Sequence, residues 1–242
     1  MKALYIILAL IFSSAGFTQN QKPTKINPER KIHLKITEPS DICIHPNGNS
    51  LFIVSDDGYL FETDMDGNII RKAEDYKGLD CEGVYADKDY VYVAEEFSRR
   101  IQVFNIHDFS IERTVRLEYN GARNSGYEAI TFNEARNRFL LFTEKNPIYL
   151  FELDENLRKV NEIDLSDISR DISAATYHNN FLWLLGDEEM TIYKVNPNTY
   201  KVLKSWKIPV VNPEGLTFDH HGNMLILSDD MQLLYYFKNP EN

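Results

Sequence analysis

The sequence has few cysteines, and none in a metal-binding or redox pattern. Cys43 and Cys81 are the only two in 242 residues, and they form no C-x-x-C pair. This excludes a disulfide scaffold and a zinc ribbon. The repeats described below place the two cysteines on neighbouring strands, about three residues out of register, which is roughly 10 Å along the strand. That separation exceeds the reach of a disulfide, so we expect two buried thiols.

Basic residues are also scarce. The chain has 26 Lys and Arg against 37 Asp and Glu, a formal net charge of −11 at pH 7. Such a surface repels nucleic acid and anionic lipid and attracts cations. We therefore predict no nucleic-acid partner.

Familiar catalytic motifs are absent. The sequence has no G-x-S-x-G, no H-E-x-x-H and no phosphate-binding loop. Serine-hydrolase, zinc-protease and P-loop chemistry therefore have no support in the sequence.

Long apolar runs are absent except at the N-terminus. Residues 1–19 read MKALYIILALIFSSAGFTQ, with a basic Lys2, an apolar run from Ala3 to Phe12 and small residues from Ser13 to Gly16. This pattern is typical of a cleavable export signal, and the run is short for a membrane span. We expect a signal peptide at 1–19, a leader at 20–30, and a periplasmic or envelope-associated protein. An uncleaved anchor that ties the protein to the membrane is the alternative.

One sequence unit occurs five times. The anchors Asp41, Glu82, Glu128, Ser173 and Glu214 follow one another at intervals of 41 to 46 residues. The units are EPSDICIHPNGNSLFIVSDD (38–57), LDCEGVYADKDYVYVAEE (79–96), GYEAITFNEARNRFLLFTEK (126–145), DISAATYHNNFLWLLGDE (171–188) and PEGLTFDHHGNMLILSDD (213–230).

Each unit predicts four strands joined by hairpin turns, as in a propeller blade. The last unit lacks a fourth strand, and an unassigned strand, KIHLKI (31–36), precedes the first. We therefore predict an all-β, five-bladed β-propeller over residues 31–242, closed by the N-terminal strand completing the last blade. Six blades is the alternative.

Acidic residues recur at two places in the units. Each first strand begins, and each second strand ends, at the same face of a propeller, so both sets should gather at one mouth of the central channel. The candidate metal ligands are Glu82, Glu128, Glu214, Glu144 and Asp41, and the other candidate residues of the mouth are Glu95, Lys145, Asn146, Asp187 and Asp229.

Carboxylates packed in this way repel one another. At ~5–6 Å and an effective dielectric of ~20, a pair costs roughly 3 kcal/mol. A hard cation with oxygen ligands, Ca²⁺ first, would relieve that repulsion, as would neighbouring basic groups. The alternative is that acids at strand ends accept backbone hydrogen bonds and join the blades.

Two other patterns are interpreted as turns. His45, His178, His220 and His221 fall in or beside turns on the face opposite the acids, so an acid–base histidine at the mouth is not expected. Residues 62–74 resemble a calcium-binding EF-hand loop but carry Ala73 where a bidentate Glu is required.

The segments LDCEGVY, NSGYEAITFN, FTEKNPIYLFEL, DISAATY and PEGLTFD resemble the SdiA-regulated (YjiK-like) β-propeller family. The similarity covers about residues 32–238. The family has Glu-Gly in its third blade and Ser-Gly in its first and fourth. This chain has Glu128-Ala129, Asp41-Ile42 and Ser173-Ala174 there.

The resemblance implies an exported or envelope-associated protein with a link to calcium response and no established catalytic residues. Glu82, Glu128, Glu144, Lys145, Asn146 and Glu214 are the positions that match.

Three functions remain open. The first is a non-catalytic, monomeric propeller that binds a cation, a small ligand or a protein partner at the acidic mouth. The second is a Ca²⁺-dependent phosphoesterase or lactonase, as in phytase-type propellers, where the cation polarises the substrate and activates water. The third is a glycosidase that uses two of the carboxylates.

Overall fold

A computed structural model describes residues 23–119 and 126–241. The predicted signal peptide at 1–19 lies outside these residues. All regular elements of the described ranges are β-strands. They include no helix long and apolar enough to cross a membrane.

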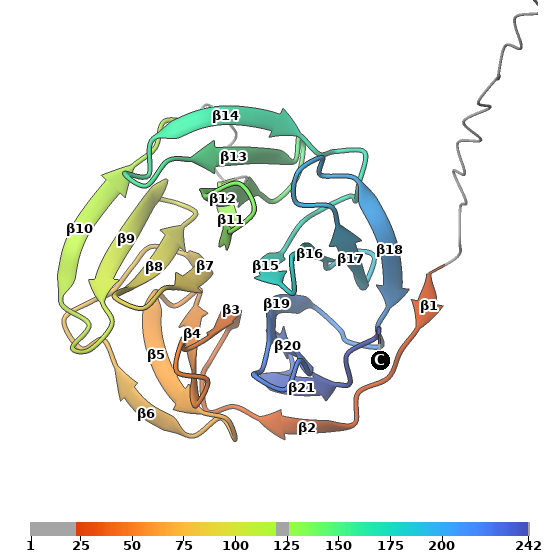
Figure 1. The fold of residues 1–242 in the computed structure, drawn as a ribbon. Coiled ribbons are helices and arrows are strands. Elements are labelled where there is room, and N and C mark those ends of the chain that lie inside the picture. The colour runs from red at the N-terminus through yellow and green to blue at the C-terminus, as the bar shows by residue number, and fades with distance from the viewer. Residues whose placement is uncertain (1–22, 120–125, 242) are drawn as a thin grey trace, which may run out of the picture.

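The strands form five sheets that surround a common axis like the blades of a propeller (Figure 1). Blade 1 consists of β3 (Pro39–Ile44), β4 (Ser50–Ser55), β5 (Tyr59–Asp64) and β6 (Ile69–Lys72). Blade 2 consists of β7 (Cys81–Ala86), β8 (Tyr90–Glu95), β9 (Arg100–Asn105) and β10 (Ile111–Arg116). Blade 3 consists of β11 (Tyr127–Asn133), β12 (Arg138–Thr143), β13 (Tyr149–Leu153) and β14 (Lys159–Asp164).

Blade 4 consists of β15 (Ala174–His178), β16 (Phe181–Gly186), β17 (Thr191–Val195) and β18 (Val202–Lys207). Blade 5 consists of β19 (Pro213–Phe218), β20 (Met224–Ser228), β21 (Leu233–Phe237) and, from the N-terminus, β2 (Arg30–His33). The predicted five-bladed propeller is confirmed, and the described residues hold no sixth blade.

The N-terminal strand closes the ring. β2 pairs antiparallel with β21, with Ile32 opposite Leu234, so the red and blue ends of the chain share one blade in Figure 1. Leu34 and Ile36, which follow β2, are buried between blades 5 and 1. This pairing covers an edge that β21 would otherwise expose.

A further short strand was not predicted. β1 (Thr24–Lys25) pairs parallel with β18 and makes a fifth strand on blade 4. It lies within the segment that the sequence assigned to a leader. Two residues are too few to show a strand's alternating pattern.

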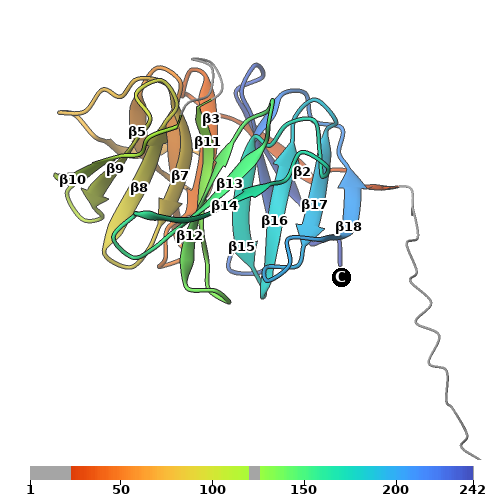
Figure 2. The same cartoon turned by 90° about the horizontal axis from the view of Figure 1, so that it is seen from above.

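The core lies between the blades. Five clusters of buried apolar side chains each join two neighbouring blades, one at each of the five seams of the ring. Phe52 and Val54 of β4, for example, pack with Val84, Val93 and Phe104 of blade 2. The second strands are buried on both faces, as in β4, whereas the fourth strands are largely exposed, as in β14. Seen from the edge, the blades stand side by side around the axis (Figure 2).

The first strands contain a β-bulge that the sequence did not reveal. The ladder between first and second strands skips Ser40, Glu82, Glu128 and Glu214 in blades 1, 2, 3 and 5. Asp41 pairs with Val54, just as Gly83 pairs with Ala94. Asp41 is therefore the counterpart of Gly83. The sequence alignment was one residue out of register in blade 1, where Ser40-Asp41 is the pair equivalent to Glu82-Gly83.

Both cysteines are free and buried, as expected. With the corrected register, Cys43 is the counterpart of Tyr85, four residues beyond Cys81. That offset is about 13 Å along the strand, too far for a disulfide.

Candidate functional site: an acidic cavity at the hub

Three glutamates occupy the bulge position at the start of a first strand. We call Glu82, Glu128 and Glu214 the bulge carboxylates. A bulge leaves its extra residue outside the ladder and redirects its side chain. The residue after each bulge carboxylate is Gly83, Ala129 or Gly215, and neighbouring blades pack closely against it at the hub. A Cβ added to Gly83 would lie 2.9 Å from the Ile130 nitrogen, and one added to Gly215 would lie 2.9 Å from Ile42 Cγ2.

A second set of acids follows the second strands. The first residue after β4, β8, β12, β16 and β20 is acidic in every blade. We call these five the turn carboxylates, and they are Asp56, Glu96, Glu144, Asp187 and Asp229. Because second strands return to the face where first strands begin, both sets meet at one end of the axis.

Together they line a cavity of about 230 Å³. Nine carboxylates and one serine form its wall: Asp56, Glu82, Glu96, Glu128, Glu144, Asp171, Ser173, Asp187, Glu214 and Asp229. No Lys or Arg is among these lining residues.

Burial and mutual repulsion disfavour charge on these groups. Desolvation, followed by the charges of neighbouring carboxylates, raises the pKa of Glu82, Glu128 and Glu214 well above the usual range. Burial likewise raises the pKa of Asp56 and Glu96 to about 7. The protein alone therefore holds several of these carboxyl groups in an unfavourable environment.

Among the residues that the structure describes, Glu128 has no partner to offset its burial. Glu128 is 8% exposed and lines the cavity. Its carboxylate makes none of the hydrogen bonds or ion pairs found among the described residues. Glu96 and Glu144 differ, because Glu96 accepts the N–H of Gly126 at 3.0 Å and Glu144 lies 2.5 Å from Lys145 Nζ. Among the described residues, the carboxylates of Glu82 and Glu214 make no hydrogen bond or ion pair either, but these two residues are only half-buried. Glu128 therefore presents to the cavity a carboxylate that no described residue pairs, and a cation bound in the cavity would neutralise it.

Two groups of three carboxylates are close enough to share an ion. One is Asp56, Asp80 and Glu82, and the other is Glu96, Glu128 and Glu144. In each triad the ligand oxygens lie within 4.8 Å of one another. Oxygens on opposite sides of one Ca²⁺ are roughly 5 Å apart, given bonds of about 2.3–2.6 Å, so the spacing fits.

The structure separates the ten candidate residues into two groups. Glu82, Glu128, Glu144, Asp187, Glu214 and Asp229 line the cavity. Asp41, Glu95, Lys145 and Asn146 do not.

Asp41 faces a neighbouring strand instead of the cavity wall. It is 1% exposed, and its Oδ2 accepts the N–H of Val84 at 2.8 Å, which ties blade 1 to blade 2. Burial raises its pKa well above the usual value.

Glu95 is a structural residue in this geometry. It is fully buried, pairs with Arg100 at 2.8 Å and accepts hydrogen bonds from the hydroxyls of Tyr76 and Ser98. Glu96, one residue on, takes the place in the wall. Lys145 and Asn146 line an adjoining cavity with Arg170 and Glu188.

Sequence reasoning did not select Asp56, Glu96, Asp80 and Asp171 as candidates. Asp56 and Glu96 were recognised as strand-end acids. Asp80 lies two residues before the bulge residue Glu82 of blade 2, and Asp171 lies two residues before Ser173, the corresponding residue of blade 4. That shared offset is the signal that could have identified them.

The histidines and the loop that resembles a calcium site are turn residues, as the sequence indicated. His45 and His178 stack on Phe52 and Phe218 at hairpins of the opposite face. Asp64 accepts the N–H groups of Asp66 and Asn68, as expected of a tight turn between β5 and β6.

Comparison with protein families matches residues 17–238 to the family described as SdiA-regulated. A search of curated proteins found no match. Among solved structures, the chain is similar to glutaminyl cyclase of Myxococcus xanthus, with a TM-score of 0.72, 14% identity, and 89% of this chain and 97% of that chain covered. It also resembles the β-propeller domain of Cps50 (Swd1) of Myceliophteria thermophila, with a TM-score of 0.50, 13% identity, and 83% and 66% covered. At these identities the structural similarities establish the fold alone.

Proposed function

Because the chain belongs to the SdiA-regulated family and its hub is lined by carboxylates, we propose that it is an exported propeller that binds divalent cations in the acidic cavity. The observation that carries the proposal is Glu128, which is buried in the wall of the cavity and whose carboxylate has no partner among the described residues.

Ca²⁺ is the favoured ion. The wall offers only oxygen ligands, with no His or Cys among its ten residues. Hard cations prefer carboxylate oxygens, and Ca²⁺ tolerates the irregular geometry of side chains contributed by different strands. In this function the protein is a non-catalytic, monomeric binding module.

A second candidate is a Ca²⁺-dependent hydrolase, a phosphoesterase or lactonase. It is favoured by the adjoining cavity, where Lys145 and Arg170 lie close to the acids and offer positive charge to an anionic substrate. A substrate panel of phosphoesters, lactones, glycosides and an N-terminal glutaminyl peptide, with and without Ca²⁺, separates the two. Turnover that is lost in Glu82→Gln/Glu128→Gln establishes the enzyme.

Thermal unfolding in EDTA and in Ca²⁺ tests the cation site. A ligand at a hundred times its dissociation constant stabilises the folded state by about 2.7 kcal/mol. For a domain of this size that is a rise of about 5–10 °C in melting temperature.

The double variant Glu82→Gln/Glu128→Gln removes one ligand from each triad and should abolish the rise. Glu134→Gln/Glu155→Gln, with two exposed acids in turns of the opposite face, is the matched control and should keep it. An equal rise in both variants, or none in the native protein, would refute the proposal.

We further propose a location in the periplasm or at the envelope, on the pattern of residues 1–19. Fractionation of expressing cells and N-terminal sequencing test this. A cytoplasmic protein that retains residues 1–19 would contradict it.

A further inference from the structure

We infer that the cavity holds two divalent cations, one in each carboxylate triad, at successive seams of the ring. The inference rests on the proposed function and adds the number and the positions of the ions.

The two triads are built from equivalent parts. Each combines the turn carboxylate of one blade with the bulge carboxylate of the next, Asp56 with Glu82 at the first seam and Glu96 with Glu128 at the second. The repeat of the sequence therefore produces this pair at the first and second seams, one blade apart, and again at the fourth seam.

A third carboxylate completes each triad from a different source. At the first seam it is Asp80, whose carbonyl oxygen accepts the N–H of Glu96 at 2.8 Å. At the second seam it is Glu144, the turn carboxylate of blade 3 itself. Each third carboxylate belongs to one triad only, although the carboxyl group of Asp80 also contacts that of Glu96 in the second triad.

The remaining seams are incomplete. A serine stands in place of the bulge carboxylate at two seams: Ser173, directly before β15, at the third, and Ser40, in its bulge, at the fifth. The fourth seam has Asp187 and Glu214 but carries Asn212 where blade 2 has Asp80. Among the described residues, no further group of three meets the spacing of the two triads.

Neutralisation also favours two ions. The triads contain six carboxylates, five of which line the cavity, and one divalent ion would contact only three of the six. A single ion in the first triad would leave Glu128 of the second triad buried and without a partner among the described residues. A volume of about 230 Å³ also leaves room for two ions with bound waters, at about 30 Å³ for each water.

Stoichiometry tests the inference directly. The purified protein is equilibrated with Ca²⁺ in about 100 mM KCl, which weakens binding to exposed acids. Bound calcium is then counted by native mass spectrometry and by calorimetry. Two ions per chain are expected. One ion would overturn the inference and leave the proposed function intact, whereas none would overturn both.

Single substitutions then assign the ions. Asp80→Asn should remove the first-seam ion, and Glu144→Gln the second-seam ion, so that each variant binds one Ca²⁺. The double variant should bind none. The control is Asp57→Asn. Asp57 is an exposed acid beside Asp56, and its carboxylate accepts a hydrogen bond from the Thr37 hydroxyl. This variant should bind two Ca²⁺ ions. Two ions retained in Asp80→Asn or in Glu144→Gln would contradict the assignment.

Discussion

At the scale of single residues, one backbone position decides whether an acid belongs to the cavity. Ser40, Glu82, Glu128 and Glu214 lie outside the ladder and start the first strands, while the next residue sits inside the hub. Asp41 is the only acid at that inner position, where the other blades have Gly83, Ala129, Ala174 and Gly215. Its carboxylate joins blades instead of facing the proposed ions.

Asp41→Ala should therefore leave Ca²⁺ affinity within about twofold of the native value. The substitution removes the acceptor of the Val84 N–H, and an unsatisfied buried donor costs about 1–3 kcal/mol. Calorimetry and thermal unfolding in EDTA measure the two effects. If Asp41→Ala lost calcium binding while its stability stayed unchanged, Asp41 would be a calcium ligand.

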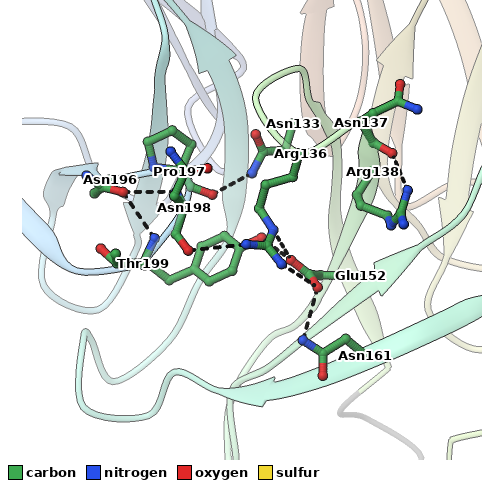
Figure 3. A network of polar contacts seen from close by, with 11 residues as sticks. Asn133, Arg136, Asn137, Arg138, Glu152, Asn161, Asn196, Pro197, Asn198 and Thr199 are labelled. Atoms are coloured by element: carbon green, nitrogen blue, oxygen red, sulfur yellow. Dashed lines mark hydrogen bonds and ion pairs between the residues drawn. The ribbon is translucent and has the colours of Figure 1, made fainter.

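At the scale of elements, turns and strands of adjacent blades are tied by polar networks on the face opposite the cavity. In Figure 3, Arg136 reaches Glu152 of β13 and Asn198 of the turn between β17 and β18. Arg136 Nε lies 2.6 Å from Glu152, and Asn133 donates to the carbonyl of Pro197 at 2.8 Å. Burial raises the pKa of Glu152, but hydrogen bonds from Tyr200, Asn161 and Arg136 outweigh it and leave the pKa below normal.

Arg136→Met should destabilise the fold by about 3 kcal/mol, because it leaves the buried Glu152 without its cation. The melting temperature should fall by about 6–12 °C, with calcium stoichiometry unchanged. Arg138→Met is the control, since among the described residues the guanidinium of Arg138 donates only to the carbonyl of Asn137. Equal melting temperatures in the two variants would show that the polar network of Arg136 does not contribute to the stability of the fold.

Sequence and structure agree on the elements and differ in register. Alternation and turn residues were enough to predict four strands per blade and the closing strand near Ile32, because those patterns span several residues. The bulge adds one residue and leaves no mark on the apolar pattern. This is why the sequence pattern aligns Asp41 with Glu82. Glu95 and Glu96 are adjacent acids at the end of β8, and the pattern does not show which of the two faces the cavity. The third ligand Asp80 lies in a loop, where periodicity gives no guidance.

At the scale of the whole molecule, the ring concentrates negative charge from all five blades at one end of its axis. Asp56 and Glu96 have pKa values raised to about 7, and Asp171 and Asp229 to about 6. In the unfolded chain such groups titrate near 4. Between these values the folded protein binds more protons than the unfolded chain, so its stability falls as pH rises.

The calcium-free protein should therefore melt at a higher temperature at pH 5 than at pH 8. The stabilising effect is complete below about pH 4 and is lost as pH passes through 6 to 7. Saturating Ca²⁺ should remove most of the difference, because it replaces protons at the carboxylates. Melting curves from pH 4.5 to 8 in EDTA and in Ca²⁺ measure this. A calcium-free protein that becomes more stable toward pH 8 would contradict the electrostatic account.

The most direct measurement is a crystal structure from crystals grown with Ca²⁺, with diffraction data recorded at a wavelength where calcium scatters anomalously. The account predicts two anomalous peaks in the hub cavity, each about 2.3–2.6 Å from carboxylate oxygens of one triad. Peaks confined to the outer surface, or a cavity occupied by water alone at millimolar Ca²⁺, would contradict it.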